Sequence, residues 1–416
     1  MRILFVHQNF PGQYVHIIQR LAQQGQHQMV ALGINALDRD RGIPESLNHF
    51  RYRLDRGNTK GVHPLVMETE TKIIRAEGCA RAAEQLKAKG FVPDLICAHP
   101  GWGESLFLKA IWPNSPLLCY QEFFYNEQGF DTNFDPEFQD ERSWQAQAKL
   151  TMKNAYLHLT LEQADWNVSP THFQASSFPD HWRRKISVIH DGVDLRKAVP
   201  NPSPAPLLLP DGTVLEKGQP IVTFVNRCLE PYRGCHTFIR AIPELQRQHP
   251  QARMVIVGQT KGVSYGAACP DGEWKDRFLE EIEGQYDPSR VHFTGTLPYD
   301  KFVPLLQLSA CHVYLTYPFV MSWSLLEAMA CGCAVVGSDT APVREAIRHG
   351  HNGLLVDFFS PNDLAAAVAD VLVDPDRAEA FGAAARETVR RTYDLDACVT
   401  RQLALMDLVA SRSIKA

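Results

Sequence analysis

The sequence contains no run of about 18 or more apolar residues, the length that a membrane-spanning helix needs. The apolar part of its first residues is too short, and the residues after it too polar, for a signal peptide. We expect these residues to form a buried first strand. Together these absences predict a cytoplasmic protein.

Cysteine pairs and basic charge are also scarce. The ten cysteines include no Cys-x-x-Cys pair, so we expect reduced core thiols and no zinc site. The net charge of −5 argues against nucleic acid as a main partner. It leaves room for a local basic patch, and peripheral contact with an anionic membrane stays an alternative. No Gly-x-Gly-x-x-Gly motif follows the first predicted strand, so a dinucleotide fingerprint is absent.

What the chain does contain is an alternation of short apolar runs and amphipathic segments from end to end. This alternation predicts an α/β protein, because parallel strands that are buried on both faces need helices on each side. A chain of 416 residues exceeds what one core usually holds, so we predict two doubly wound, Rossmann-like domains. Ligands of such sheets bind beyond the carboxyl ends of the strands, which places the predicted site in the cleft between the domains.

A proline-dense stretch is expected to separate the two domains. We predict a first domain over residues 1–197, a linker over 198–218 and a second domain over 219–395. Segment 396–416 is helical and could cross back to the first domain. The predicted strands are Ile3–Val6, His27–Ala31, Asp94–Ala98, Pro116–Tyr120, Trp166–Ser169, Ile186–His190, Ile221–Val225, Ala252–Val257, Val291–Gly295, Cys311–Leu315, Ala334–Gly337 and Gly353–Val356.

The most informative stretch runs from Tyr317 to Asp339 and is interpreted as a loop, a short helix and a buried strand. Free N–H groups around Ser322, Ser324 and Leu325, together with the helix dipole, would attract an anion. Glu327 follows one turn later and could accept hydrogen bonds from sugar hydroxyls. A diphosphate held by backbone and a ribose held by a carboxylate describe a nucleotide-sugar site. The alternative is a core helix with two incidental serines.

Two arginines follow the first strand of the second domain. Arg227 and Arg233 could hold a diphosphate and stabilise its charge as it leaves, although Arg233 could also be a surface charge beside a helix. Further along, Gly295, Thr296 and Leu297 end another strand. Their backbone groups could contact the edge of a nucleobase, but this is also a common strand–turn sequence.

In the first domain, two strand ends carry candidate residues. Gly12 would let backbone approach a ligand closely, with a plain turn as the alternative. His99 could donate to a sugar hydroxyl, with a satisfied histidine as the alternative. Trp102 and Glu104 could line the same cleft. Asp38-Arg-Asp40 matches the Asp-x-Asp of metal-dependent sugar transferases, but it lies in a polar loop far from the predicted diphosphate site, and we expect no metal there.

Together these motifs resemble retaining glycosyltransferases of family 4, which have the two-domain GT-B fold. The resemblance runs over nearly the whole chain and is strongest from Ile221 to Val371. Four matches carry it, namely Val188–Asp194 before the linker, Leu326–Gly332, Glu345, and Asn352–Val356.

The resemblance implies transfer of a hexose-type sugar from a nucleotide-diphosphate donor, with retention of configuration and without a metal or another cofactor. It assigns the donor phosphates to Arg227 and Arg233, the ribose to Glu327, and further donor contacts to Gly12 and His99. The acceptor would be a glycan, a lipid-linked molecule or a small molecule, in glycan, polysaccharide or glycolipid biosynthesis.

Two positions depart from the family pattern. Arg233 stands where the family has a lysine, and it comes one residue later than the usual spacing. The first glutamate of the family's Glu-x7-Glu motif, which ordinarily contacts the transferred sugar, falls at Phe319. The change could reflect a donor without the hydroxyls that this glutamate binds, another sugar pose, or an inactive relative. We favour an active enzyme of a divergent subgroup. The alternatives are a non-catalytic nucleotide-sugar-binding protein and a nucleotide-sugar epimerase or hydrolase on the same fold.

Overall fold

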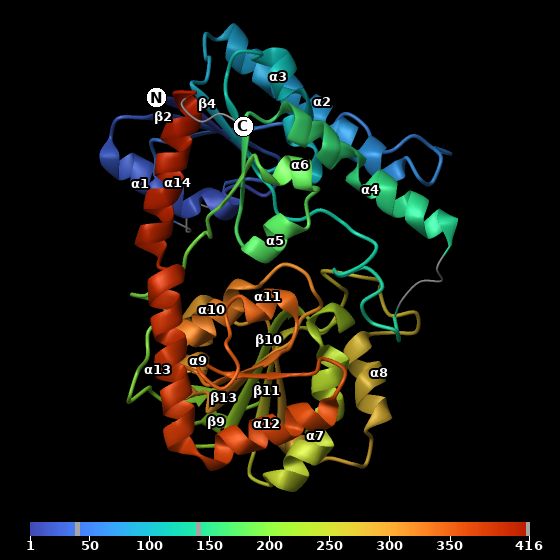
Figure 1. Ribbon diagram of the computed structural model, residues 1–416, viewed down its shortest axis with the longest axis vertical. Coiled ribbons are helices and arrows are strands. Elements are labelled where there is room, and N and C mark those ends of the chain that lie inside the picture. The colour runs from blue at the N-terminus through green and yellow to red at the C-terminus, as the bar shows by residue number, and fades with distance from the viewer. Residues whose placement is uncertain (38–41, 139–142, 413–416) are drawn as a thin grey trace. The chain divides into compact units, whose positions relative to one another are not determined.

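The computed structural model describes residues 1–37, 42–138 and 143–412. Its contacts divide the chain into two units, each built on a parallel sheet between helices (Figure 1). Unit 1 comprises Met1–Asn133, Gln139–Asp191 and Asp396–Ala416, and unit 2 comprises Phe134–Phe138 and Gly192–Leu395. This architecture confirms the predicted α/β fold class of two doubly wound domains.

The sheet of unit 1 has seven parallel strands in the order β3-β2-β1-β4-β5-β6-β7. Apolar residues fill its inner strands, and Leu95–Ala98 is buried throughout. The direction of strand order reverses between β1 and β4, which is where sheets of this kind bind ligands. The strands are β1 (Arg2–Val6), β2 (Gln28–Gly33), β3 (Asn48–Arg51), β4 (Leu95–Ala98), β5 (Leu117–Tyr120), β6 (Trp166–Ser169) and β7 (Ile186–Val188).

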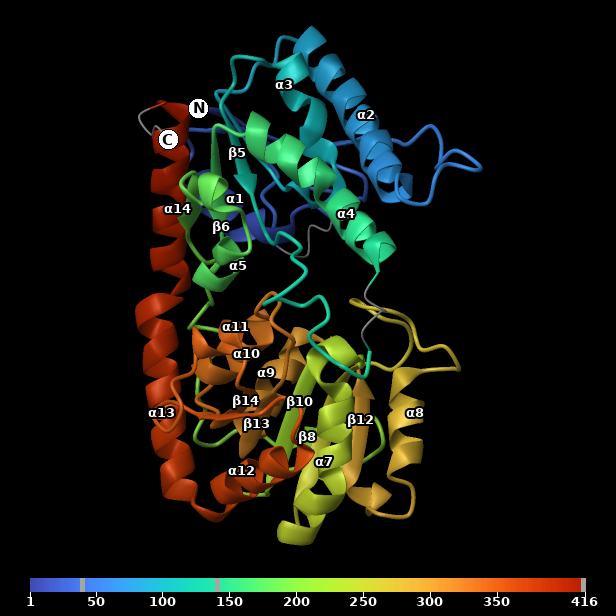
Figure 2. The same cartoon turned by 45° about the vertical axis from the view of Figure 1, so that its right-hand side comes forward.

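Helices cover both faces of this sheet. On one face, α1 (Val15–Gln24) buries Ile17, Ile18 and Leu21, and α14 (Leu395–Ala410) joins the same core. The other face carries α2 (Met67–Ala88), and α4 (Trp144–Gln163) packs beside α2 (Figure 2). The short helices of unit 1 are α3 (Leu108–Ile111), α5 (His172–Ser176) and α6 (Asp180–Arg183).

The main sheet of unit 2 repeats this topology with six parallel strands in the order β12-β11-β10-β13-β14-β15. Its direction of strand order reverses between β10 and β13. The strands are β10 (Ile221–Cys228), β11 (Arg253–Gln259), β12 (Val291–Gly295), β13 (Cys311–Tyr314), β14 (Val335–Ser338) and β15 (Leu354–Val356). One face is covered by α7 (Cys235–Gln248), α8 (Trp274–Glu281) and α12 (Pro361–Val373), and the other by α9 (Tyr299–Leu308), α10 (Trp323–Ala330) and α13 (Pro375–Thr392). The remaining short helix is α11 (Ala341–Arg344).

Every predicted strand is present, with shifts of a few residues at its ends. The strand β3 was missed because Asn48–Arg51 is polar and only partly buried at the edge of the sheet. The predicted linker contains a short hairpin of β8 (Leu207–Leu208) and β9 (Val214–Leu215). Leucines of this hairpin pack in the core of unit 2.

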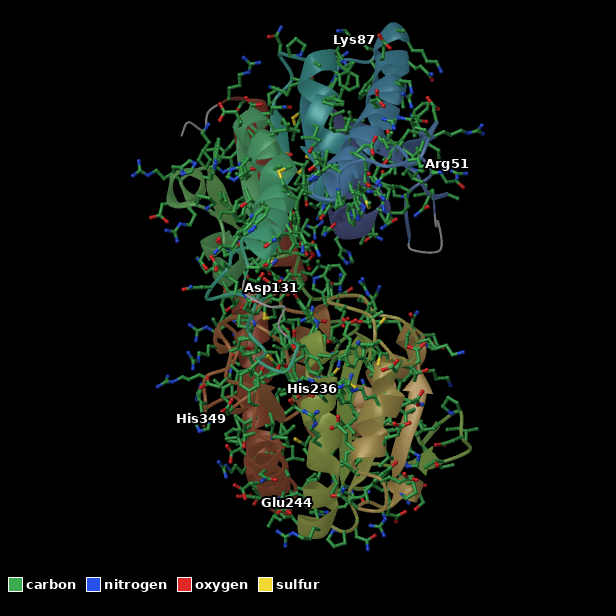
Figure 3. All side chains as sticks on the ribbon, turned by 90° about the vertical axis from the view of Figure 1, so that its right-hand side faces the viewer. Arg51, Lys87, Asp131, His236, Glu244 and His349 are labelled. Atoms are coloured by element: carbon green, nitrogen blue, oxygen red, sulfur yellow. The ribbon has the colours of Figure 1, made fainter. Side chains whose placement is uncertain are left out.

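A five-residue segment, Phe134–Phe138, packs within unit 2 although its neighbours in sequence belong to unit 1. We call it the inserted segment. Its Asp135 is buried and accepts a hydrogen bond of 2.8 Å from the Tyr317 hydroxyl, and the same carboxylate oxygen lies 3.1 Å from His236 Nε2. His236 lies in the first turn of α7, and Glu244 lies nearer its other end (Figure 3). The inserted segment is therefore fixed beside the start of α7.

Candidate functional site

A pocket of about 270 Å³ lies in unit 2 where the direction of strand order reverses. Its walls come from the end of β10 with the loop that follows it, the loop after β11, and the first turns of α10. Charged and hydroxyl-bearing side chains dominate the lining. The lining residues are Val225, Asn226, Arg227, Glu230, Arg233, Tyr265, Ser322, Trp323, Ser324 and Glu327. The structure thus brings together five of the residues that the sequence predicted.

The two predicted arginines have different environments in this pocket. Arg227 is exposed at the pocket wall, so its guanidinium can meet a ligand. Arg233 is buried, and its Nη1 donates to Thr316 Oγ1 at 2.8 Å and to the Val320 carbonyl at 2.9 Å. Arg233 therefore holds the segment before α10 in place, as well as lining the pocket. This excludes the alternative of a plain surface charge for Arg233.

The segment between β13 and α10 is packed inward. Phe319 is 6% exposed, and its ring lies 5.0 Å from that of Tyr265 and 5.7 Å from that of Tyr232 between centroids. Within the described residues, Phe319 is not part of the pocket lining. A carboxylate at this position would have to displace the packing of aromatic rings.

The prediction of free N–H groups at the start of α10 is wrong. The N–H of Ser322 donates to the Tyr314 hydroxyl at 2.8 Å, and that of Ser324 donates to Ser322 Oγ at 3.3 Å. The N–H of Leu325 donates to the Ser322 carbonyl, and the Leu325 side chain is buried in the core. The sequence pattern located the helix start but could not show that Tyr314, at the end of β13, reaches it. The two serines line the pocket, and their hydroxyl oxygens lie 2.9 Å apart, within hydrogen-bond distance of each other.

Glu327 lines the pocket one turn after Ser324. Burial raises its pKa to about 7, although a hydrogen bond with Tyr299 acts in the opposite direction. This carboxyl group therefore changes charge near neutral pH, and it can accept hydrogen bonds from hydroxyl groups when it is ionised.

Three of the predicted donor contacts lie elsewhere in unit 2. Gly295 ends β12, the edge strand, and Thr296 and Leu297 follow it. Two strands separate β12 from β13, and none of the three residues is among the residues that line the described pocket. Leu297 packs against the core instead.

In unit 1, the corresponding strand ends carry a cluster of rings. His7 follows β1 and His99 follows β4, and their rings lie 5.2 Å apart between centroids. Trp102 contacts both, at 4.8 Å from His7 and 4.7 Å from His99. Gly12 has a φ of +51°, and a Cβ atom there would lie 2.3 Å from the His7 ring. Only glycine fits this backbone position, so Gly12 belongs to the same cluster.

His99 is buried, and its Nδ1 accepts a hydrogen bond of 3.1 Å from the Gly101 N–H. The proton of the neutral ring is therefore on Nε2, which lies 3.8 Å from a Glu122 carboxylate oxygen. Burial, and then the nearby His7 and Lys72, hold the pKa of His99 well below its ordinary value. At neutral pH His99 is an uncharged donor.

Glu104 does not line a cleft. It is fully buried, and its carboxylate accepts a hydrogen bond of 2.5 Å from the Tyr52 hydroxyl. Nearby, Lys72 Nζ donates to the Gly101 carbonyl at 2.6 Å. Lys72 thus bonds the loop that follows His99, and Glu104 joins the continuation of that loop to Tyr52.

Neither a metal cluster nor a membrane helix is found in the described ranges. No group of three or more His, Cys, Asp and Glu side chains there could hold a metal ion. The motif at positions 38–40 lies outside the described residues. No helix of residues 1–37, 42–138 and 143–412 combines the length and apolar character needed to span a bilayer.

Sequence reasoning missed three prominent lining residues, Glu230, Tyr265 and Trp323. Glu230 and Trp323 stand beside the predicted arginines and serines, so proximity in sequence was the available signal. Tyr265 lies in the loop after β11, and the rule that ligands bind at the carboxyl ends of strands could have pointed to it.

The structure has two doubly wound α/β units, and unit 2 contains a pocket lined mostly by charged and hydroxyl-bearing side chains. Residues 25–198 match the family model described as Glycosyl transferase family 4 group, and residues 209–388 match the model described as Glycosyl transferases group 1. The first half of the chain is thus similar to the family 4 group and the second half to the group 1 family of glycosyltransferases.

Curated relatives agree with this class. The D-inositol 3-phosphate glycosyltransferase of Nocardia farcinica (strain IFM 10152) is 30% identical over 203 residues, which is 48% of this chain and 42% of that protein. The GDP-mannose-dependent alpha-(1-6)-phosphatidylinositol monomannoside mannosyltransferase of Mycobacterium tuberculosis (strain ATCC 25618 / H37Rv) is 29% identical over 225 residues, 51% of this chain and 53% of that protein. The chain matches only about half of the length of these relatives.

Solved structures share the fold over almost the whole chain. Anabaena Alr3699/HepE in complex with UDP and glucose has a TM-score of 0.65 at 17% identity, covering 98% of this chain and 99% of that one. Sucrose-phosphate synthase (tll1590) from Thermosynechococcus elongatus has a TM-score of 0.70 at 18% identity, covering 99% and 100%.

Proposed function

We propose that this protein transfers a hexose-type sugar from a nucleotide-diphosphate donor to an acceptor hydroxyl, with retention of configuration and without a metal ion. The observation that carries the proposal is the pocket itself, in which Arg227, Arg233 and the Glu327 carboxylate line one cavity. Permanently charged guanidinium groups suit a diphosphate, and a carboxylate suits the hydroxyls of a ribose.

The pocket residues have defined roles in this reaction. The bond between the anomeric carbon and the donor phosphate breaks, a bond to the acceptor oxygen forms on the same face of the sugar, and the acceptor proton passes to the departing phosphate oxygen. Arg227 stabilises the negative charge that develops on that phosphate, in the role that a metal ion has in other enzymes. Arg233 holds the segment before α10 in place and also contributes its own positive charge.

Unit 1 supplies the remaining contacts in this proposal. His99 presents an uncharged Nε2–H, which suits a sugar hydroxyl better than a phosphate. Gly12 leaves backbone open to the donor. The relatives support a nucleotide-sugar donor, since one is named for GDP-mannose and one solved neighbour holds UDP and glucose. The proposed acceptor is a glycan, a lipid-linked molecule or a small molecule, and the proposed place of action is the cytoplasm, with peripheral membrane contact as a further proposal.

The test is a donor and product assay. The purified protein is incubated with UDP-glucose, UDP-N-acetylglucosamine, UDP-galactose or GDP-mannose and a mixed acceptor panel, with and without EDTA. We expect turnover of one nucleotide class, an unchanged rate in EDTA, and a product whose anomeric configuration, measured by the one-bond C1–H1 coupling, matches that of the donor. A product of inverted configuration, or a rate abolished by EDTA and restored by Mg²⁺, would contradict the proposal.

A second candidate is a non-catalytic nucleotide-sugar-binding protein. The buried, carboxylate-free segment around Phe319 favours it, because that segment offers no acidic side chain to a sugar. Calorimetric binding of a donor without turnover, across the acceptor panel, would support this candidate. Hydrolysis of the donor without transfer would instead indicate a nucleotide-sugar hydrolase.

A further inference from the structure

The loop between β11 and α8, residues 260–273, contributes one aromatic ring to the donor pocket. Tyr265 lies in this loop, is partly exposed, and lines the pocket together with Arg227 and Arg233. The rest of the pocket lining is mostly charged and hydroxyl-bearing.

The loop is fixed by a carboxylate that lies completely inside the protein. Glu230 is 0% exposed and accepts hydrogen bonds from the N–H of Ser264 at 2.5 Å and of Tyr265 at 3.1 Å. Burial raises the pKa of Glu230, and these bonds oppose that effect. A buried carboxylate lowers stability unless its oxygens accept hydrogen bonds. Both oxygens of Glu230 accept them from backbone N–H groups of this loop, so Glu230 fixes the position of the loop.

The ring of Tyr265 is held from three sides. The Arg233 guanidinium lies 5.1 Å from its centroid, the Phe319 ring meets it at 5.0 Å and 68°, and the Tyr232 ring is stacked at 6.1 Å. Gly266 lets Tyr232 approach, since a Cβ atom there would lie 2.9 Å from the Tyr232 ring. The pocket therefore contains a preorganised aromatic surface.

This aromatic surface and Glu327 line the same pocket but have different neighbours. The neighbours of Glu327 are Tyr299 and Cys331, whereas those of Tyr265 are Glu230, Arg233 and Phe319. In the proposed function Glu327 binds the ribose and the arginines bind the diphosphate. The next group along the donor, beyond the diphosphate, is the transferred sugar, and Tyr265 contacts one of the two arginines that bind the diphosphate in that proposal.

We propose that Tyr265 is a specificity-determining residue that binds the transferred sugar through its ring, against the C–H face of the hexose. This inference rests on the proposed function and adds the residue that distinguishes one donor sugar from another. An aromatic ring suits this task because it offers apolar area with little loss of side-chain entropy. Phe319 supports the ring from behind and does not itself meet the sugar.

The experiment compares nucleotides with and without a sugar. Isothermal titration calorimetry measures UDP, GDP, UDP-glucose, UDP-N-acetylglucosamine and GDP-mannose on the wild type, Tyr265→Phe, Tyr265→Ala and Glu230→Gln. Tyr286→Ala is the matched control, because Tyr286 lines a separate surface with Gln246 and Arg247. The readout is the affinity for the nucleotide sugar divided by that for its parent nucleotide.

We expect Tyr265→Ala to lower this ratio about five- to tenfold for the preferred sugar, since ring contacts of this kind contribute that much. Affinity for UDP and GDP should stay within about twofold, because the phosphate contacts remain. Tyr265→Phe should keep the wild-type ratio, and Glu230→Gln should lower it less than Tyr265→Ala does.

Two results overturn the proposal. An unchanged ratio in Tyr265→Ala shows that the ring does not contact the sugar, while leaving the proposed function intact. A wild type that binds none of the five nucleotides overturns the proposed function together with this inference. If Tyr265→Ala does not fold, Tyr265→Leu and Glu230→Gln provide the same comparison, and unchanged ratios in both count against the proposal.

Discussion

The loops at the two sheet reversals differ in charge although the sheets share one topology. In unit 2 the end of β10 carries Arg227, the loop after it carries Glu230 and Arg233, and the Glu327 carboxyl group, with a pKa of about 7, lines the same pocket. In unit 1 the equivalent edge carries His7 and His99, whose side chains pack as rings, and burial keeps His99 uncharged. The same sheet topology therefore presents charged side chains at the strand ends of unit 2 and uncharged hydrogen-bonding side chains at those of unit 1.

This difference suggests a division of work. A charged diphosphate is bound best where fixed positive charge lines the pocket, whereas a hydroxyl-rich ligand needs donors that carry no charge. Each edge also has its own support. Arg233 holds the segment before α10, and Lys72 holds the loop after His99 by the Gly101 carbonyl.

The largest effect is expected from removing the charge of unit 2. Arg227→Ala should lower kcat/KM by about two to three orders of magnitude, because a stabilising charge on the leaving phosphate is worth roughly 2.7–4 kcal/mol. Steady-state kinetics with the accepted donor measures this change. Arg247→Ala is the control, since Arg247 is exposed on α7 and pairs with Glu244 outside the pocket. Wild-type kinetics in Arg227→Ala would remove its proposed role.

A smaller effect, on stability, is expected from a substitution in the inserted segment of unit 2, Phe134–Phe138. Asp135→Ala should destabilise unit 2 by about 1.5–3 kcal/mol, because a buried carboxylate that bonds Tyr317 and His236 is lost. Its pKa is lowered because bonds from His236 and Tyr317 outweigh burial, which acts in the opposite direction. This stabilisation is therefore present above the unfolded pKa and lost as pH falls through the folded pKa. Urea unfolding at neutral and acidic pH measures it.

The control for this prediction is Glu244→Ala on the same helix as His236. Glu244 is at the exposed end of α7 (Figure 3), and its loss should change stability little. Equal destabilisation by both variants, or no acid dependence of the difference between wild type and Asp135→Ala, would contradict the assigned support.

The two supports also show how far the sequence could go. It predicted the strands, the place of Arg227 at the end of one, and the helix that carries Glu327, because these follow from local periodicity and from strand ends. It could not predict that Tyr314 takes the N–H of Ser322, since that bond depends on how β13 and α10 pack. The strand-end rule could have pointed to the loop that carries Tyr265, but not to the bond between Glu230 and the Tyr265 N–H that fixes it, because that bond joins two distant loops.

The next test concerns the neutral edge. Lys72→Met should lower kcat by about tenfold while leaving donor KM nearly unchanged. The Gly101 carbonyl, in the loop after His99, loses the hydrogen bond that Lys72 donates, and the loop shifts. Stability should change by less than about 1.5 kcal/mol, since a lost hydrogen bond is offset by no longer burying the charge of Lys72. Burial, the largest influence, lowers the pKa of Lys72 and supports this offset.

Lys87→Met is a matched control on the same helix. Lys87 Nζ also donates to a backbone carbonyl, that of Ile111 at 2.6 Å, but from an exposed position (Figure 3). Identical kcat values for the two variants would show that Lys72 contributes nothing specific to His99. A change confined to KM would also count against the positioning role.

The smallest effect is a pH dependence that distinguishes the two edges. If the ionised form of Glu327 binds the ribose, donor affinity should fall about fourfold from about pH 8 to about pH 6.5, because the carboxyl becomes protonated around its pKa of about 7. His99 should add nothing over this range, since its pKa lies far below it. Calorimetry with a nucleotide sugar, whose diphosphate does not titrate there, measures the profile, and Glu327→Gln should make it flat. The folded-state pKa of Glu327 is raised, so its contribution to stability is greatest at acidic pH and is lost as pH rises through about 7, opposite in sign to the trend in affinity. If donor affinity still depends on pH in Glu327→Gln, another group titrates, and the proposed contact between Glu327 and the ribose is contradicted.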